Sequence, residues 1–144
     1  MIGRRDNLEP KILSQIQEAE EMTKDNDQMD LIVAFNYGGR NEIISVVQEL
    51  VASASKGEIT ASDISEHLIS ERLDTVGIPD PDLLIRTSGE KRLSNFLLWQ
   101  CAYTEFVFTE TNWPDFDSQK LDDAIDEYCR RDRRYGGVAE ATGK

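Results

Sequence analysis

The stretch DLLIRTSGEKRLSNFLLWQCAYTEFVF, residues 82–108, alternates between apolar runs and one polar loop. Residues 83–87 and 105–109 have the length and the apolar composition of buried strands. Between them, residues 95–103 carry no charge and follow Ser94, a residue type that often caps a helix, so we expect a buried helix there. A strand, a helix and a second strand in this order predict a parallel sheet, and hence an α/β fold.

The remainder of the chain continues this alternation of helices and strands. Residues 31–37, LIVAFNY, form a continuous apolar run that is typical of a strand covered on both faces. We expect further helices over residues 8–24, 41–55 and 60–73, and one that begins at Ser118. The pattern predicts a single α/β domain over residues 1–144, with a parallel sheet flanked by helices. Three strands are fewer than such sheets usually have, so we expect the domain to be incomplete on its N-terminal side.

The composition narrows the class of the protein and its partners. The chain has 16 Lys and Arg against 28 Asp and Glu, a formal net charge of -12, which argues against nucleic-acid binding because that depends on basic residues. No apolar run approaches the roughly 20 residues of a transmembrane helix, and the N-terminus lacks the apolar core of a secretory signal. Cys101 and Cys129 show no metal-binding spacing. We therefore predict a cytoplasmic protein with no nucleic-acid partner and no transmembrane segment.

The polar loop at residues 86–95 combines arginines, a lysine and hydroxyl groups in an otherwise acidic chain. Arg86 follows a predicted strand, and ligands of α/β sheets bind beyond the carboxyl ends of the strands. Arg92 lies in the loop, and Ser94 begins the expected helix, whose free N–H groups and dipole attract anions. Gly89 lets the loop fold closely, and guanidinium groups bind phosphate oxygens bidentately. A phosphate or diphosphate is therefore the predicted ligand.

A purely structural interpretation of the same loop is equally compatible with the spacing. The two arginines would then form ion pairs with the carboxylates of Asp82, Glu90 or Glu105. Ser94 would only cap the helix. Basic residues are common in loops near helix starts, so the spacing alone does not decide between the two interpretations.

Three motifs of the chain resemble one known family. The segment DLLIRTSGEKRLSNFLLWQCAYTEFVFTETNWPDF, residues 82–116, closely resembles the signature of the cis-prenyltransferases, the undecaprenyl diphosphate synthase family. NYGGRNEI (residues 36–43) and RRYGG (residues 133–137) resemble its other C-terminal motifs, in the same order. The resemblance implies an Mg²⁺-dependent transferase that joins isopentenyl diphosphate to an allylic prenyl diphosphate and so makes a Z-polyprenyl diphosphate lipid carrier. It also implies a homodimer, with peripheral membrane contact through the lipid product.

The resemblance assigns roles to individual residues. It implies that Arg86, Arg92, Leu93 and Ser94 hold the isopentenyl diphosphate, and that Glu105 is a magnesium ligand. Sequence alone would make Glu105 an ordinary surface carboxylate at the start of a strand.

Two further motifs have structural alternatives. By resemblance, Arg134 belongs to an R-x-G motif that reaches the diphosphate site across the dimer. By helix physics alone, Arg134 would complement the dipole at the end of the last helix. NYGGR is interpreted as architectural, namely a strand end, a glycine turn and a helix start.

Two segments of the family do not occur in these 144 residues. The family's catalytic aspartate lies in an MDGNGRW-type segment that binds magnesium and the allylic diphosphate, and a loop with an Asn-Trp pair assists proton removal. Asn112-Trp113 belongs to the C-terminal motif and is no substitute. We therefore expect no catalytic residue in this chain and no activity of the chain alone, although it keeps the isopentenyl diphosphate site. The alternatives are a non-catalytic partner subunit of a cis-prenyltransferase and an inactive fragment.

Overall fold

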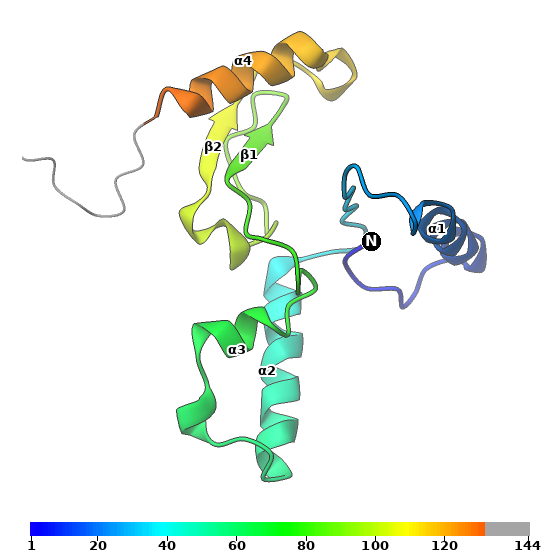
Figure 1. Ribbon diagram of the computed structural model, residues 1–144, viewed down its shortest axis with the longest axis vertical. Coiled ribbons are helices and arrows are strands. Elements are labelled where there is room, and N and C mark those ends of the chain that lie inside the picture. The colour runs from blue at the N-terminus through cyan, green and yellow to red at the C-terminus, as the bar shows by residue number, and fades with distance from the viewer. Residues whose placement is uncertain (132–144) are drawn as a thin grey trace, which may run out of the picture. The chain divides into compact units, whose positions relative to one another are not determined.

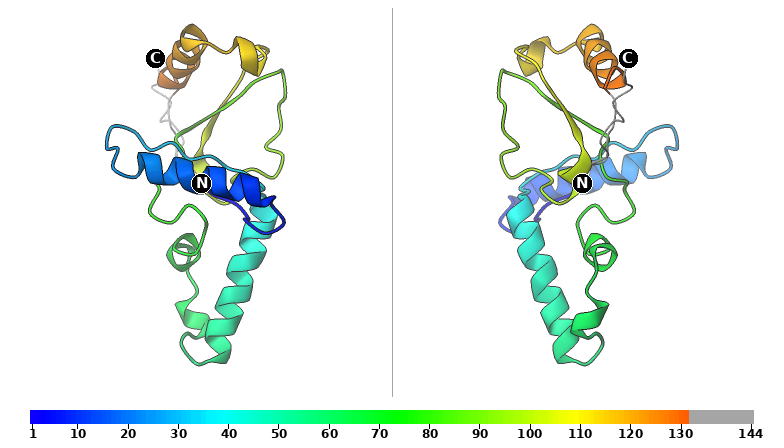
Figure 2. Two further views of the ribbon diagram at one scale, coloured as in Figure 1. Left: turned by 90° about the vertical axis from the view of Figure 1, so that its right-hand side faces the viewer. Right: turned by 90° about the vertical axis from the view of Figure 1, so that its left-hand side faces the viewer.

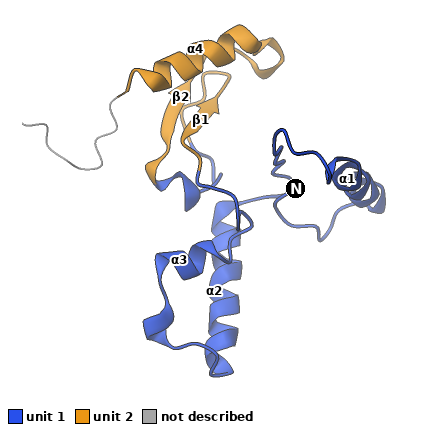
Figure 3. Ribbon diagram, in the orientation of Figure 1, with its two compact units in different colours: residues 1–80, 93–102 blue, residues 81–92, 103–144 orange. Residues whose placement is uncertain are grey.

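The structure, a computed structural model, describes residues 1–131 (Figure 1). They form two compact units (Figure 3), which consist of residues 1–80 with 93–102 and of residues 81–92 with 103–131. The polar loop is divided between them, with Arg86 and Arg92 in the second unit and Ser94 in the first. Within the described residues, no helix is both long enough and apolar enough to cross a bilayer.

The two long helices of the first unit lie where the sequence predicts them. α1 (Pro10–Thr23) has a proline at its start, where the missing N–H would have no partner within the helix in any case. α2 (Gly39–Ser55) begins two residues earlier than expected. It is followed by Gly57, whose φ of +75° is the left-handed conformation that commonly ends a helix.

The helix expected over residues 60–73 is divided into two short ones, η1 (Ala61–Asp63) and α3 (Glu66–Ser70). The predicted capping box is present at the start of η1. Ser65 then caps α3, because its hydroxyl oxygen accepts a hydrogen bond from the amide of Leu68 at 3.1 Å. This second cap starts a new helix within the segment, so the expected single helix is wrong.

The core of the first unit lies between α2 and residues 59–73, the segment that contains η1 and α3 (Figure 2). Val46, Leu50 and Leu73 are buried there. The side chains that pack around them are those of Ile59, Leu68, Ile69 and Trp99. Trp99 Nε1 donates to Ser70 Oγ at 3.1 Å, so the indole keeps a polar partner while its ring packs on the core.

The strand expected over residues 31–37 is wrong. A single parallel bridge joins Ala34 to Ile2. The backbone of Ile2 makes both hydrogen bonds of this bridge, with Val33 and Phe35, at 3.0 and 3.1 Å. The apolar side chains of the segment are exposed rather than covered. A strand requires partners along its length. Besides the bridge, the described residues give this segment one further backbone partner, the amide of Arg4, which donates to the carbonyl oxygen of Asn36 at 3.3 Å.

The apolar helix expected over residues 95–103 is also wrong. Ser94, Asn95 and Leu97 have φ values of +52°, +63° and +43°, in the left-handed region that interrupts a right-handed helix. A short 3₁₀ helix, η2 (Gln100–Tyr103), is the regular structure that remains. Ser94 is therefore not a helix cap, because a cap has an extended backbone.

The second unit contains the parallel strand pair that the sequence predicts (Figure 1). β1 (Leu83–Arg86) and β2 (Glu105–Phe108) pair with their first residues opposite each other. Both strands point toward α4 (Ser118–Cys129), which contacts β2. α4 begins at the expected residue because the carboxylate of Asp117 accepts the hydrogen bond of the Lys120 amide at 3.0 Å. The parallel pair with its helix agrees with the predicted α/β class.

Candidate functional site

The polar loop after β1 is fixed to the segment that follows β2. The amide of Ser88 donates to the carbonyl oxygen of Thr111, and the amide of Gly89 donates to that of Thr109, both at 2.9 Å. Gly89 has a φ of +67°, which favours glycine. A Cβ atom at Gly89 would lie 2.5 Å from a carboxylate oxygen of Glu110. Hydrogen bonds therefore position the backbone of the loop, and Gly89 allows the close fold that the sequence predicts.

Arg86 and Arg92 meet within this loop. Arg86 Nη1 donates to the backbone carbonyl oxygen of Arg92, and the side chain of Arg92 forms an ion pair with Glu90. The predicted ion-pair alternative therefore holds for Arg92. Its side chain is 65% exposed, so an anion from solvent can reach it. The structure thus brings together two of the predicted anion-binding residues at the end of β1.

The other predicted ligand-binding residues belong to the first unit or lie outside the described residues. Leu93 and Ser94 belong to the first unit. Because no α-helix begins at Ser94, the expected contribution of a helix N-terminus to anion binding is wrong, and only the hydroxyl of Ser94 remains as a candidate group. Arg134 lies outside the described residues.

Asn95 caps the N-terminus of α2 from 55 residues away. The amide of Gly39 donates to the backbone carbonyl oxygen of Asn95, and the amide of Arg40 donates to its side-chain oxygen, both at 2.8 Å. A Cβ atom at Gly38 would lie 2.8 Å from Asn95 Nδ2, and one at Gly39 would lie 3.0 Å from Leu98 Cγ. The two glycines therefore permit this close approach, which supports the glycine turn and the helix start in the architectural interpretation of NYGGR; the strand end in that interpretation is wrong. No local pattern in the sequence connects Asn95 to α2, so this role could not be predicted from the sequence.

A second residue that the sequence analysis missed is Glu42, whose residue exposure is only 7%. Its carboxylate accepts hydrogen bonds from Tyr37 Oη at 2.6 Å, from the amide of Asp74 at 2.9 Å and from Gln100 Nε2 at 3.2 Å. Gln100 also donates to Thr75 Oγ1 at 3.0 Å. Burial, together with the hydrogen bond to Glu42, raises the pKa of the Tyr37 hydroxyl. The carboxylate thus joins three segments of the first unit.

Glu105, the candidate metal ligand, lies at the start of β2. Its Oε2 atom accepts a hydrogen bond from Arg131 Nη1 at 2.9 Å, which raises the pKa of Arg131. Among residues 1–131, the His, Cys, Asp and Glu side chains form no group of three that could hold a metal ion. Magnesium commonly uses one or two carboxylates, substrate phosphates and water. Glu105 therefore fits as one carboxylate ligand of a metal that arrives with a diphosphate, and does not form a metal site by itself.

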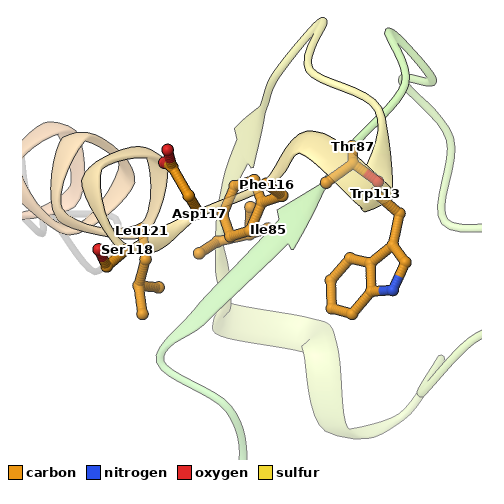
Figure 4. A pocket seen from close by; sticks show the side chains of 7 residues that line it. All are labelled: Ile85, Thr87, Trp113, Phe116, Asp117, Ser118 and Leu121. Atoms are coloured by element: carbon orange, nitrogen blue, oxygen red, sulfur yellow. The ribbon is translucent and has the colours of Figure 1, made fainter.

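An apolar cavity of about 510 Å³ lies in the second unit (Figure 4). Ile85 and Thr87 line it from β1 and the residue that follows, and Leu121 lines it from α4. Trp113 and Phe116 stack beside it, with ring centroids 6.2 Å apart. The cavity could accept an apolar group, and no motif of the sequence indicated it.

Comparisons with known proteins agree on one family. A family model described as "Putative undecaprenyl diphosphate synthase" matches residues 1–136. An isoprenyl transferase of Agrobacterium fabrum is 51% identical over 140 residues, which cover 97% of this chain and 57% of that protein. A ditrans,polycis-undecaprenyl-diphosphate synthase ((2E,6E)-farnesyl-diphosphate specific) of Micrococcus luteus is 50% identical over 137 residues, which cover 95% and 55% of the two chains.

The structural comparison gives the same result. The crystal structure of lavandulyl diphosphate synthase from Lavandula x intermedia, in complex with dimethylallyl diphosphate, matches with a TM-score of 0.89 at 39% identity. The match covers 94% of this chain and 58% of that one. The chain therefore has the fold of these proteins and spans little more than half of their length.

Proposed function

Because the chain belongs to the undecaprenyl diphosphate synthase family of prenyltransferases, we propose that it carries the isopentenyl diphosphate site of a cis-prenyltransferase. The complete enzyme joins isopentenyl diphosphate to an allylic prenyl diphosphate, releases diphosphate and forms a Z-polyprenyl diphosphate. In this proposal Arg86, Arg92, Leu93 and Ser94 bind the isopentenyl diphosphate, and Arg134 completes the site.

The observation that carries the proposal is the hydrogen bond from the Arg86 guanidinium to the backbone carbonyl oxygen of Arg92, which holds both residues at the carboxyl end of β1. Two guanidinium groups in one loop match the oxygens of a diphosphate, which accept bidentate hydrogen bonds. The net charge of -12 repels such an anion at long range, so binding depends on this local concentration of positive charge. Glu90, which pairs with Arg92, is 39% exposed. A diphosphate that displaces Glu90 from this exposed ion pair therefore loses little free energy.

The bound isopentenyl diphosphate is the acceptor in this reaction. Its double bond attacks the allylic carbon, the allylic diphosphate departs, and a proton is then lost from the acceptor. Arg86 and Arg92 neutralise the diphosphate that the acceptor retains and so fix the position of its double bond. Magnesium, when bound, would stabilise the departing diphosphate, and Glu105 would supply one of its ligands.

We propose that turnover requires residues beyond these 144. The MDGNGRW-type segment with the family's catalytic aspartate does not occur among them, and the chain spans 57% of the Agrobacterium relative. The further proposals are one prenyltransferase domain, a homodimer and a cytoplasmic location. In the alternative, a partner subunit of a cis-prenyltransferase, the same chain would support the site of another polypeptide.

Calorimetric titration of the full chain with isopentenyl diphosphate tests the site. Arg86→Gln and Arg92→Gln each remove one guanidinium, and we expect each to weaken binding by about tenfold or more, since charged hydrogen bonds contribute about 1.5–3 kcal/mol. Lys91→Gln is the matched control, because it makes the same charge change in the same loop. Equal affinities for all three variants would show that the loop does not bind the diphosphate specifically.

A further inference from the structure

We propose that Arg131 is a positioning residue that holds the carboxylate of Glu105 and is displaced from it when a divalent cation binds. This inference rests on the proposed role of Glu105 as a magnesium ligand, and the experiment below distinguishes a failure of one from a failure of the other. Arg131 lies just beyond the C-terminus of α4, and Glu105 begins β2. The contact therefore joins the last helix of the described chain to the strand that carries the candidate ligand.

The pair differs from the other ion pairs at the end of α4 in its burial. The side chains of Arg131 and Glu105 are 33% and 29% exposed, with Nη1 and Oε2 2.9 Å apart. The neighbouring pair of Arg130 and Asp126 is 80% and 70% exposed, with a separation of 3.6 Å. Solvent screens a half-buried ion pair less than an exposed one, so the pair of Arg131 with Glu105 is the stronger of the two. Arg131 is therefore the residue that competes with a cation approaching Glu105.

Arg131 has a second ion-pair partner, so its separation from Glu105 costs little free energy. Its Nη2 atom forms an ion pair with Glu127, one helical turn earlier, and so uses a different nitrogen from the one that contacts Glu105. When a cation takes the carboxylate of Glu105, the guanidinium keeps Glu127 as its partner. The exchange therefore leaves no uncompensated positive charge on Arg131.

The space beside the pair suits a hydrated cation. A cavity of about 230 Å³ is lined by Glu105, Arg131, Tyr128 and Cys129. A water molecule takes about 30 Å³, so the cavity admits several waters. Magnesium usually retains several waters when a protein binds it. A hydrated divalent cation can thus reach Glu105 from the side on which Arg131 holds it.

The test measures binding of Mn²⁺, as a probe for Mg²⁺, to the full chain in the presence of isopentenyl diphosphate, by electron paramagnetic resonance of the free ion and against the same mixture without protein. We expect Arg131→Gln to bind Mn²⁺ about two- to fivefold more tightly than the wild type, which corresponds to the loss of a competing ion pair. Arg130→Gln is the matched control, since it removes the same charge one residue away, and we expect a smaller gain. Arg131→Lys, which keeps the charge but not the guanidinium, should lie between wild type and Arg131→Gln.

Glu105→Gln, alone and combined with Arg131→Gln, separates the two proposals. If Glu105→Gln weakens Mn²⁺ binding and abolishes the gain of Arg131→Gln, both proposals are supported. If Glu105→Gln weakens binding but Arg131→Gln and Arg130→Gln are equal, Glu105 is a ligand and the displacement of Arg131 is refuted. If Glu105→Gln changes nothing in either background, the assignment of Glu105 fails and the inference fails with it. Far-UV circular dichroism verifies that every variant retains its helices.

Discussion

Replacing Asn95 by alanine should destabilise the first unit by about 2–3 kcal/mol, for two separable reasons. The side-chain oxygen of Asn95 caps α2 by accepting the hydrogen bond of the Arg40 amide at 2.8 Å. Loss of such a cap costs about 1 kcal/mol. Asn95 also has a φ of +63°, and a left-handed backbone costs an alanine about 1–2 kcal/mol, whereas asparagine and glycine adopt it readily.

A series of substitutions at Asn95 separates the two contributions. Asn95→Gly removes the cap but tolerates the backbone, so we expect a loss of about 1 kcal/mol. Asn95→Asp keeps an oxygen acceptor and adds negative charge at a helix N-terminus, so we expect stability within about 0.5 kcal/mol of the wild type or slightly above it. The predicted order of stability is therefore aspartate, then glycine, then alanine.

Urea denaturation followed by circular dichroism at 222 nm measures this order. Asn112→Ala is the control, because the side chain of Asn112 makes no capping hydrogen bond and its φ is -70°; we expect a change within about 0.5 kcal/mol. An Asn95→Ala variant as stable as Asn112→Ala would refute the cap. Equal stabilities of Asn95→Ala and Asn95→Gly would refute the contribution of the left-handed backbone.

Three further changes test other contacts of the structure. Gly39→Ala should cost about 1–3 kcal/mol in urea denaturation, because its Cβ atom would lie 3.0 Å from Leu98 Cγ. Gly89→Ala should cost about 1–2 kcal/mol through its φ of +67°, and should also weaken isopentenyl diphosphate binding in calorimetry, because the loop would move. Burial and Glu42 raise the pKa of Tyr37 above its ordinary value of 10.0, so its contribution to stability is complete below pH 10 and is lost as the pH rises above it. Tyr37→Phe should therefore lose less stability than the wild type between pH 9 and pH 11 in urea denaturation, and equal losses would contradict this origin of the pKa shift.

The features that the sequence predicts correctly depend on local patterns. The apolar stripes of α1, α2 and α4 and the short apolar runs of β1 and β2 are properties of neighbouring residues, and these elements appear within about two residues of their expected bounds. The parallel pairing follows from the order of the elements.

The features that the sequence predicts incorrectly depend on distant partners. Residues 31–37 are apolar enough for a strand, but their pairing is set by what lies beside them, which is Ile2 at a single bridge. Residues 95–103 are apolar enough for a helix, but the backbone of Asn95 turns left-handed and caps α2 instead. Neither outcome could be predicted from the composition of the segment itself, because hydrophobicity indicates burial and does not specify the partner.

In the candidate site, too, the sequence indicates the local features and not the contacts between distant residues. The basic loop at Arg86 and Arg92 is visible in the sequence because it stands out against an acidic chain. The role of Glu105 comes from the family resemblance alone, because the pattern around it is that of an ordinary strand start. Its contact with Arg131 joins residues 26 positions apart and becomes visible only in the structure.

Incorporation of radiolabelled isopentenyl diphosphate into polyprenyl product tests whether these residues carry the acceptor site of a cis-prenyltransferase. The assay, with farnesyl diphosphate and magnesium, compares the 144-residue chain with a chimera in which this chain is joined to the remaining part of the Agrobacterium isoprenyl transferase. We expect product from the chimera, strong loss of product in the chimera with Arg86→Gln, and none from the 144 residues alone. A chimera that works equally well with Arg86→Gln, or a 144-residue chain that is active by itself, would contradict this expectation.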